Sequence, residues 1–515
     1  MVRYLLQQPR TLESLALKKL GDYIALQGEK LEALLTELRL RDATKAEALL
    51  SRQIKVIQSR LDCNVPRMLH DKLLEEIIRA ISSYFRDRRN SDTFVMGRMV
   101  ETMFTKKVTR ISLSYQDQIL NSVCSKSYML TGLIELSLFN LKFSEAELIQ
   151  LLRELHNLKI LSFQHCLYYC SEAILRCIVD NCKFIEDLDL STSHVNDNGI
   201  EILTQLCNLK RIDLRYTDVT QAGVKTLITC CKNIDHIFDS RLIASALQQI
   251  ASLKENAGKH FNLKSFDNAR NTVLQPNQLQ FIIQLCPLIQ NINFDCGPPD
   301  SGCNPDFHYR EPLYYPYSLK VLNDLHDLRH LKLNHYSFYR HHLNEVLELR
   351  GQNLVKLDLQ VYEMDINALT CLVQTCPNLE NLYINFLFYY EEKNLGTKFK
   401  NVFERTRSFA KNLYSKENKK QKTIPHMTKL RFLSVDIEPT HEKLLIFLLA
   451  SCLNVEFIST GYSVTLTDDI MLQVLDKNPL SRLKELKMWY SNLSMLSIDR
   501  IIQNCNKPPI VALHV

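Results

Sequence analysis

Residues 209–230 read LKRIDLRYTDVTQAGVKTLITC, and this stretch decides the fold. Leu209, Ile212 and Leu214 follow the pattern L-x-x-L-x-L, which places apolar side chains on the inner face of a short strand and turns the intervening residues outward. After Thr220, a residue type that caps helix starts, apolar residues recur at helical spacing. The stretch therefore predicts a strand, a turn and a helix.

The same pattern recurs along most of the chain. Its first apolar residue stands at Val108, Leu133, Leu158, Ile185, Leu209, Ile234, Leu263, Ile289, Leu328, Leu354, Leu379, Leu430, Val455 and Leu483. Most intervals fall within the period of roughly 20 to 29 residues that is typical of leucine-rich repeats. We therefore expect an α/β fold, a leucine-rich-repeat solenoid or horseshoe of about fourteen repeats.

Composition bounds the class of protein. A chain of 515 residues is longer than one hydrophobic core usually serves, which agrees with repeats that pack only on their neighbours. The net charge is a modest +6, no apolar run is long enough to span a bilayer, and the N-terminal residues show no signal-peptide cleavage site. We expect a protein of the cytoplasm, the nucleus or both, without membrane contact.

No motif for catalysis is present. The sequence contains no Walker loop, dinucleotide-binding loop, nucleophile elbow or His-Glu-x-x-His zinc motif. The nearest metal-like groups are Cys166 with Cys170 and the adjacent pair His341 and His342. Cys166 falls three residues after the last apolar residue of its strand, Phe163, where the repeat buries a cysteine. Adjacent histidines on a helix point in different directions, which disfavours a shared metal ion. We predict no enzyme activity, no cofactor and no metal.

Cysteines recur at one position of the repeat. Those that come just before the next repeat's first apolar residue, and mark the helix ends, are Cys182, Cys207, Cys231, Cys286, Cys376 and Cys452. We expect them to be small buried apolar residues. With Cys166 and the phrase YTDVTQAGV at 216–224, they resemble the cysteine-containing subtype of leucine-rich repeat over roughly residues 108–515. That subtype is most often met in substrate receptors of ubiquitin ligases, so the resemblance implies this function by association.

Two repeats are lengthened within the predicted repeat domain of residues 106–515. The insertions fall near 295–325 and 386–427, where we expect surface loops. From Lys393 to Thr423, ten Lys or Arg stand against two Glu, a local charge of +8. A contact with nucleic acid or an acidic partner and a solvated loop both fit this charge. No recognised nucleic-acid-binding fold accompanies it, so we favour the loop and do not expect a nucleic-acid partner.

Residues 1–105 lack the repeat and form a separate helical module, for adaptor binding or capping. Apolar spacing predicts helices over 11–24, 29–40, 44–61 and 69–85, with a capping box made by Thr44 and Glu47. One interpretation is a cap that covers the open core of the first repeat, because terminal repeats need such a cover. The other is a docking module for a partner protein.

The second interpretation rests on residues 11–20, TLESLALKKL. They resemble the elongin-binding box of ubiquitin-ligase receptors, with Ala16 in place of the usual cysteine. Leu12, Ala16 and Leu20 match its spacing of i, i+4 and i+8, which is expected to put them on one helix face able to enter a hydrophobic groove. The resemblance implies that these three residues contact the adaptor.

A second box-like segment follows at residues 65–78, VPRMLHDKLLEEII. It resembles the cullin-selecting box, with Arg67 where an apolar residue is expected, and equally the opening of an F-box. By this resemblance Val65, Pro66 and Leu69 are adaptor contacts. Two boxes ahead of repeats are similar to the ZYG and ZER type of elongin-cullin receptor.

Together these resemblances imply a noncatalytic substrate receptor of a cullin-RING ubiquitin ligase. Its N-terminal helices would dock an adaptor, either elongin B/C with a cullin or an F-box adaptor with a cullin, and its repeats would bind a protein substrate. The alternative is a leucine-rich-repeat scaffold for protein interactions that has no ligase role.

Alternation along the predicted strands turns one set of side chains outward. The candidates for substrate contact are Arg211, Asp213, Arg215, Lys356, Asp358, Tyr383 and Trp489. Aromatic and arginine side chains dominate binding hot spots, which favours Arg215, Tyr383 and Trp489. For Trp489, simple cover of the last repeat is an equal alternative.

Overall fold

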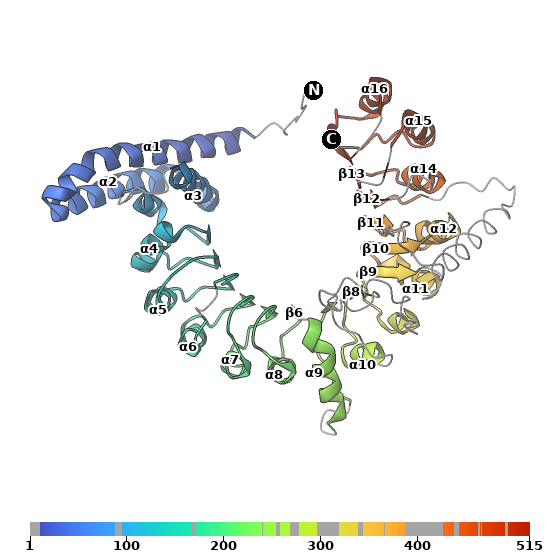
Figure 1. Cartoon of the computed structure of the whole chain (residues 1–515), viewed down its shortest axis with the longest axis horizontal. Coiled ribbons are helices and arrows are strands. Elements are labelled where there is room, and N and C mark those ends of the chain that lie inside the picture. The colour runs from blue at the N-terminus through green and yellow to red at the C-terminus, as the bar shows by residue number, and fades with distance from the viewer. Residues whose placement is uncertain are drawn as a thin grey trace, which may run out of the picture. The chain divides into compact units, whose positions relative to one another are not determined.

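The computed structural model of the chain divides into two compact units, Pro9–Leu263 and Lys264–Val515. The residues that it describes are 11–87, 95–166, 170–238, 240–253, 258–267, 278–295, 319–337, 343–364, 366–386, 426–436, 442–461, 464, 466–489 and 493–514. In each unit, short strands lie along one side and helices along the other (Figure 1).

The first unit begins with helices. They are α1 (Leu12–Arg41), α2 (Ala43–Asn64), the 3-10 turn η1 (Arg67–Leu69), α3 (His70–Asp87) and the 3-10 helix η2 (Met96–Met103). Helix α1 packs along α3 and also contacts α2 and η2. Helix α1 is therefore the central helix of this module, and the first strand, β1, follows η2.

Six repeats, each a strand followed by a helix, complete the first unit. Its strands are β1 (Arg110–Ser114), β2 (Glu135–Phe139), β3 (Ile160–Ser162), β4 (Asp187–Asp189), β5 (Arg211–Asp213) and β6 (His236–Phe238), and they form one parallel sheet in chain order. Its helices are α4 (Asp117–Ser125), η3 (Ser127–Met129), α5 (Glu145–Glu154), α6 (Glu172–Asn181), α7 (Asp197–Leu203), α8 (Gln221–Cys230) and α9 (Ser240–Ser252).

The second unit repeats the arrangement around a nine-stranded parallel sheet, also in chain order. Its strands are β7 (Ser265–Asp267), β8 (Asn291–Asp295), β9 (His330–Ser337), β10 (Lys356–Glu363), β11 (Asn381–Phe386), β12 (Phe432–Asp436), β13 (Phe457–Thr460), β14 (Glu485–Trp489) and β15 (Ile510–His514). Its helices are α10 (Gln278–Leu285), η6 (Leu319–Asp324), α11 (Leu343–Arg350), η7 (Gly351–Asn353), α12 (Ile366–Thr375), α14 (Glu442–Ser451), α15 (Asp468–Lys477) and α16 (Met495–Asn504).

The register of the strands explains the repeated leucines. Leu136 pairs with Leu161, and Leu188 pairs with Ile212, so equivalent side chains of successive repeats stack in one row. These residues are buried between sheet and helices, whereas their neighbours along each strand point to the other side. The chain is therefore an α/β leucine-rich-repeat solenoid with a helical N-terminus, as the sequence predicts. We call the side of each sheet turned away from the helices its open face.

Some local predictions were wrong. The helices expected over 11–24 and 29–40 are one helix, α1, because Gly21 and Gly28 are tolerated where neighbouring chain approaches closely. Helix α2 is capped by Asp42, whose side chain accepts from the Lys45 amide, so Thr44 is inside the helix and forms no capping box. The pattern also misses β15, which follows two prolines and pairs in parallel with β14.

The cysteine positions hold with one exception. Cys182, Cys231, Cys286, Cys376 and Cys452 are buried, whereas Cys207 is exposed because it follows the short helix α7 by several residues. Most of both predicted insertions, including Lys393 to Thr423, lies outside the described residues. His341 and His342 do as well.

Candidate functional site

Helix α1 is apolar on two opposite faces. One face packs inside the module through Leu17, Ile24 and Leu35, all buried. Its two glycines allow close approach. A Cβ on Gly21 would lie 2.9 Å from the backbone carbon of Glu76 on α3. This face of α1 therefore forms part of the core of the helical module.

The opposite face is exposed. The exposed fraction is 84% for Leu12, 41% for Leu15, 57% for Tyr23, 46% for Leu26 and 73% for Leu34. Isolated exposed leucines are common on protein surfaces, whereas a row of them on one helix is a candidate surface for macromolecular contact. We call this row the α1 stripe and define it as Leu12, Leu15, Ala16, Lys19, Tyr23, Leu26, Lys30, Ala33 and Leu34.

The predicted adaptor residues of α1 belong to this stripe only in part. Leu12 and Ala16 are exposed, whereas Leu20 is half-buried. A spacing of four residues advances about 40° around a helix, so Leu20 lies about 80° from Leu12, at the edge of the packed face. Sequence reasoning missed Leu15, Tyr23 and Leu26, although their spacing of three, eleven and fourteen residues from Leu12 follows a helical stripe more closely.

The second predicted set lies in the turn between α2 and α3. Pro66 is exposed, and Val65 and Leu69 are half-buried. Met68, which the sequence did not single out, is 82% exposed and is the most accessible apolar side chain of this turn. The turn therefore presents Pro66 and Met68 to solvent, while its other predicted residues are partly covered.

The next residues of the same segment serve the fold. Asp71 Oδ1 accepts hydrogen bonds from the Thr109 amide at 2.8 Å and the Arg110 amide at 3.3 Å, and its other oxygen accepts from the Thr109 hydroxyl. His70 is buried, with Nδ1 3.1 Å from the Pro66 carbonyl oxygen. This part of the box-like segment thus joins α3 to the start of β1.

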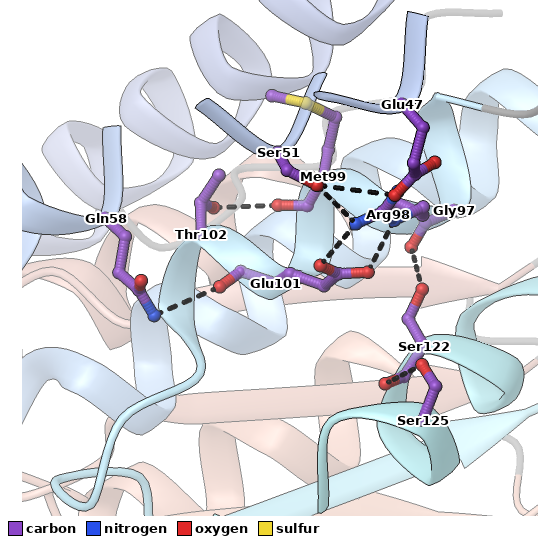
Figure 2. A network of polar contacts seen from close by, with 10 residues as sticks. All are labelled: Glu47, Ser51, Gln58, Gly97, Arg98, Met99, Glu101, Thr102, Ser122 and Ser125. Atoms are coloured by element: carbon purple, nitrogen blue, oxygen red, sulfur yellow. Dashed lines mark hydrogen bonds and ion pairs between the residues drawn. The ribbon is translucent and has the colours of Figure 1, made fainter. Parts of the chain in front are cut away.

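A polar network fastens α2 to η2 (Figure 2). The Arg98 guanidinium binds the carboxylates of Glu47 on α2 and Glu101 on η2, and the network continues to Ser51. The amide of Gln58 donates to the Phe104 carbonyl at 2.5 Å. Arg98 is half-buried and Glu101 is 4% exposed, so the network is partly shielded from solvent. The helical module is therefore held by charged as well as apolar contacts.

The open face of the first sheet carries the predicted residues Arg211 and Asp213 of β5, and Arg215 follows two residues after the strand. Arg211 Nε donates a hydrogen bond of 2.8 Å to Oδ2 of Asp187 on β4. Arg215 binds Asp213 through Nε and Nη2, and its guanidinium carbon lies 5.9 Å from the centroid of the Phe238 ring. The bond to Asp213 raises the pKa of Arg215. Asp213 is only 7% exposed because Arg215 covers it, so the arginine is the accessible member of this pair.

The open face of the second sheet brings Lys356, Asp358 and Tyr383 together. Strand register places Lys356 beside Asn381 and Asp358 beside Tyr383. Lys356 Nζ lies 5.2 Å from the Tyr383 ring centroid, and Asp358 forms a 3.3 Å ion pair with Lys332. These four residues form one mixed patch of cations, an anion and an aromatic ring.

Two further aromatic residues extend this patch and were missed. Phe432 stacks on Tyr383 with ring centroids 5.0 Å apart, and Phe457 is its register partner on β13. Both occupy outward positions of their strands, where the repeat pattern carries no signal for apolar residues. Trp489 is half-buried on β14, and β15 lies beyond it, so Trp489 is not on the last strand.

Asparagines link successive repeats, and sequence reasoning missed them as well. Each one precedes the first apolar residue of a strand and donates its side-chain amide to a backbone carbonyl of the preceding repeat. The pairs are Asn157 to Thr131, Asn208 to Lys183, Asn233 to Cys207, Asn262 to Lys232, Asn353 to His326, Asn378 to Gln352 and Asn454 to Thr428. The recurring Asn followed by Leu, Ile or Val is a signal that the sequence does contain.

We next consider whether the described residues include a metal site or a reactive thiol. None of their histidine, cysteine and acidic side chains gather into a group of three that could hold a metal ion. Burial raises the pKa of the Cys182 and Cys376 thiols to about 12, which disfavours the thiolate. None of the described helices is long and apolar enough to cross a membrane. The arrangement offers surfaces for macromolecular contact.

Comparison with known proteins gives fold neighbours only. No protein-family model matches the chain. A leucine-rich-repeat protein of Leptospira interrogans is 14% identical, with 80% of this chain and 91% of that chain covered and a TM-score of 0.34. The structure of the TLR13 complex with ssRNA13 is 12% identical, with 78% of this chain and 57% of that chain covered and a TM-score of 0.33. The structure of the Rad7 and Elc1 complex in yeast is 11% identical, with 93% of this chain and 96% of that chain covered and a TM-score of 0.39.

Proposed function

We propose that this protein is a noncatalytic substrate receptor of a cullin-RING ubiquitin ligase, acting in the cytoplasm or the nucleus. The N-terminal helices dock an adaptor, elongin B/C or an F-box adaptor, and the open faces of the repeats bind a protein substrate. The single observation that carries the proposal is the α1 stripe, an exposed apolar helix face directly ahead of a leucine-rich-repeat solenoid. An amphipathic helix of this kind can enter a hydrophobic groove.

The substrate side of the proposal rests on the two open faces. Arg215 is held in place by Asp213 and Phe238, and Tyr383 by Phe432 and Lys356. Side chains that are already ordered lose less conformational entropy on binding. Arginine and aromatic residues held in this way are suited to be hot spots of a protein interface.

Co-purification of the full-length chain with each adaptor tests the adaptor side. The wild-type chain is expected to retain either elongin B/C or an F-box adaptor, and Leu12→Asp is expected to lose it. Because Leu12 is 84% exposed, this change leaves the fold intact, which circular dichroism would verify. Recovery of neither adaptor, or equal recovery with Leu12→Asp, would contradict the proposal.

A scaffold without a ligase role is the second candidate. The observation that favours it is the bond between Asp71 and Thr109, which fixes α3 to the first strand as a cap would. Under this alternative, Leu12→Asp changes neither the stability nor any partner of the chain. An untargeted pull-down with wild type and Leu12→Asp, compared by mass spectrometry, separates the two candidates by whether a cullin is lost.

A further inference from the structure

The geometry of α1 sets its two faces apart. Taking Leu12 as the origin of a helical projection, the glycines Gly21 and Gly28 lie about 160° to 180° away. Both meet neighbouring chain, since a Cβ on Gly28 would lie 2.7 Å from Met96 Sδ. Tyr23 and Leu26 lie within about 40° of Leu12. The exposed apolar row is therefore opposite the packed face along several turns.

The charges of α1 are divided in the same way. Two of its acidic side chains form ion pairs with α3: Glu13 pairs with Lys72 at 2.6 Å, and Asp22 pairs with Arg79 at 2.9 Å. Glu32 accepts from the Val95 amide at 2.8 Å and the Met96 amide at 3.1 Å. Three acids of this helix, Glu13, Asp22 and Glu32, are thus used within the fold.

The charges within the α1 stripe are both positive. Lys19 and Lys30 are exposed, and no carboxylate among the described residues forms an ion pair with either. Glu37, the next charged residue on this face beyond Leu34, ends the stripe. A partner surface complementary to the stripe is apolar along its floor and acidic where it meets the two lysines.

We propose that the whole α1 stripe is one docking face, and that its occupant is an adaptor with an apolar groove bordered by acidic side chains. The inference rests on the proposed function and extends it. From Leu12 to Leu34 the face is about 33 Å long at 1.5 Å per residue. The box-like segment, residues 11–20, covers only its first third, so Tyr23, Leu26 and Lys30 are contacts that lie beyond the box.

The apolar part of the inference is tested with full-length variants and a purified elongin B/C heterodimer, and in parallel with an F-box adaptor. Tyr23→Asp and Leu26→Asp are each expected to raise the Kd about tenfold or more, as loss of a buried interface anchor does. Leu40→Asp is the matched control, since Leu40 is 86% exposed on the same helix but lies beyond the stripe. Its Kd is expected to equal that of the wild type.

The charge part is tested by reversing the lysines. The double variant Lys19→Glu, Lys30→Glu is expected to bind more weakly than the wild type, most of all at low salt, so that the salt dependence of binding is reversed. Lys45→Glu is its control, because Lys45 is exposed in the first turn of α2, away from the stripe. Equal Kd values for the double variant and the wild type at low and high salt would overturn the acidic groove.

The outcomes separate the inference from the proposed function. If the wild type binds an adaptor and only Leu12→Asp loses it, the proposed function stands and the longer docking face is wrong. If the wild type binds neither adaptor, both are wrong. Sedimentation equilibrium of the same samples detects the remaining occupant: a wild-type dimer that Leu26→Asp dissociates would assign the stripe to a second copy of the chain and overturn the inference.

Discussion

Asp71 and Thr109 are joined by two hydrogen bonds, since the Asp71 carboxylate accepts from both the amide and the hydroxyl of Thr109, and the same carboxylate also accepts from the Arg110 amide. The pair connects the first turn of α3 to the residue before β1. The free edge of the first sheet is thereby covered at its start by a helix, which is how many proteins protect an edge strand.

Removal of this carboxylate is expected to loosen β1. Asp71→Ala leaves the Thr109 and Arg110 amides without their acceptor, at a cost of about 1 to 3 kcal/mol. Hydrogen exchange is the measurement, with faster exchange expected in β1 than in β3. The control is Glu75→Ala on the same helix. The Glu75 side chain is 59% exposed, and its Oε1 forms a long ion pair of 3.6 Å with Nη2 of Arg110, which contributes little. Exchange in β1 should therefore not change in this variant.

Asn478 is expected to matter more than Asn454. Asn478 is 1% exposed, donates to the Leu449 and Cys452 carbonyls, and accepts from the Leu480 amide. Replacement by Ala leaves several buried groups unpaired, at about 1 to 3 kcal/mol, whereas Asn454→Ala breaks one bond in a half-exposed site, at about 1 kcal/mol. Urea unfolding of both variants checks the order, and an equal shift of the midpoints would contradict it.

Gly21→Ala is expected to destabilise the helical module. Alanine favours a helix over glycine by about 1 kcal/mol, but its Cβ would meet the α3 backbone at Glu76, and overpacking costs about 1 to 3 kcal/mol. Gly28→Ala is the comparison, because its Cβ meets the flexible side chains of Met96 and Met99. Thermal unfolding followed by circular dichroism should show a lower Tm for Gly21→Ala than for Gly28→Ala.

The contact between the last two helices is expected to weaken in acid. Hydrogen bonds from the Ser497 hydroxyl and the Ser494 amide hold the pKa of Asp468 below its usual value of 3.8. Because the pKa of Asp468 is lower in the folded than in the unfolded state, its carboxylate stabilises the fold at pH values above the unfolded-state pKa. This stabilisation is lost as the pH falls through the folded-state pKa. The stability difference between wild type and Asp468→Asn should therefore be present at pH 7 and shrink below about pH 4.

Thiol labelling of the native chain should distinguish exposed from buried cysteines. Cys63, Cys207 and Cys230 are exposed and should react with a maleimide first, whereas the Cys182 and Cys376 thiols, whose pKa burial raises to about 12, should react only after unfolding. Mass spectrometry of peptides from labelled protein gives the order. Early labelling of Cys376 would contradict the buried helix end.

The sequence predicts repeats well because one physical requirement recurs: each strand needs apolar side chains between sheet and helix. All fourteen predicted strand positions carry strands. The strand β15 escaped the pattern because Pro508 and Pro509 stand where the repeat has its first apolar residue. The single helix α1 was missed because glycine is a poor helix former, and only the packing against Glu76 and Met96 shows why it is present.

The candidate surfaces are less predictable than the core. Alternation correctly turns Arg211 and Arg215 outward, but it cannot show that Arg215 covers Asp213, which depends on side-chain geometry. It also gives no reason to expect Phe432 and Phe457 on an open face. In α1, the box-like spacing pointed to Leu20, whereas the burial of each side chain depends on where α3 packs. Partners of a helix face are set by tertiary contacts that local sequence does not contain.

The asparagines that link the repeats also have a direction in time. Each one, such as Asn378, donates to a carbonyl that lies earlier in the chain, here that of Gln352. During synthesis the acceptor has therefore already left the ribosome when the asparagine emerges. Each new repeat can close its link to the folded part without waiting for residues still to be translated, so the solenoid is suited to fold from its N-terminal end as it is made.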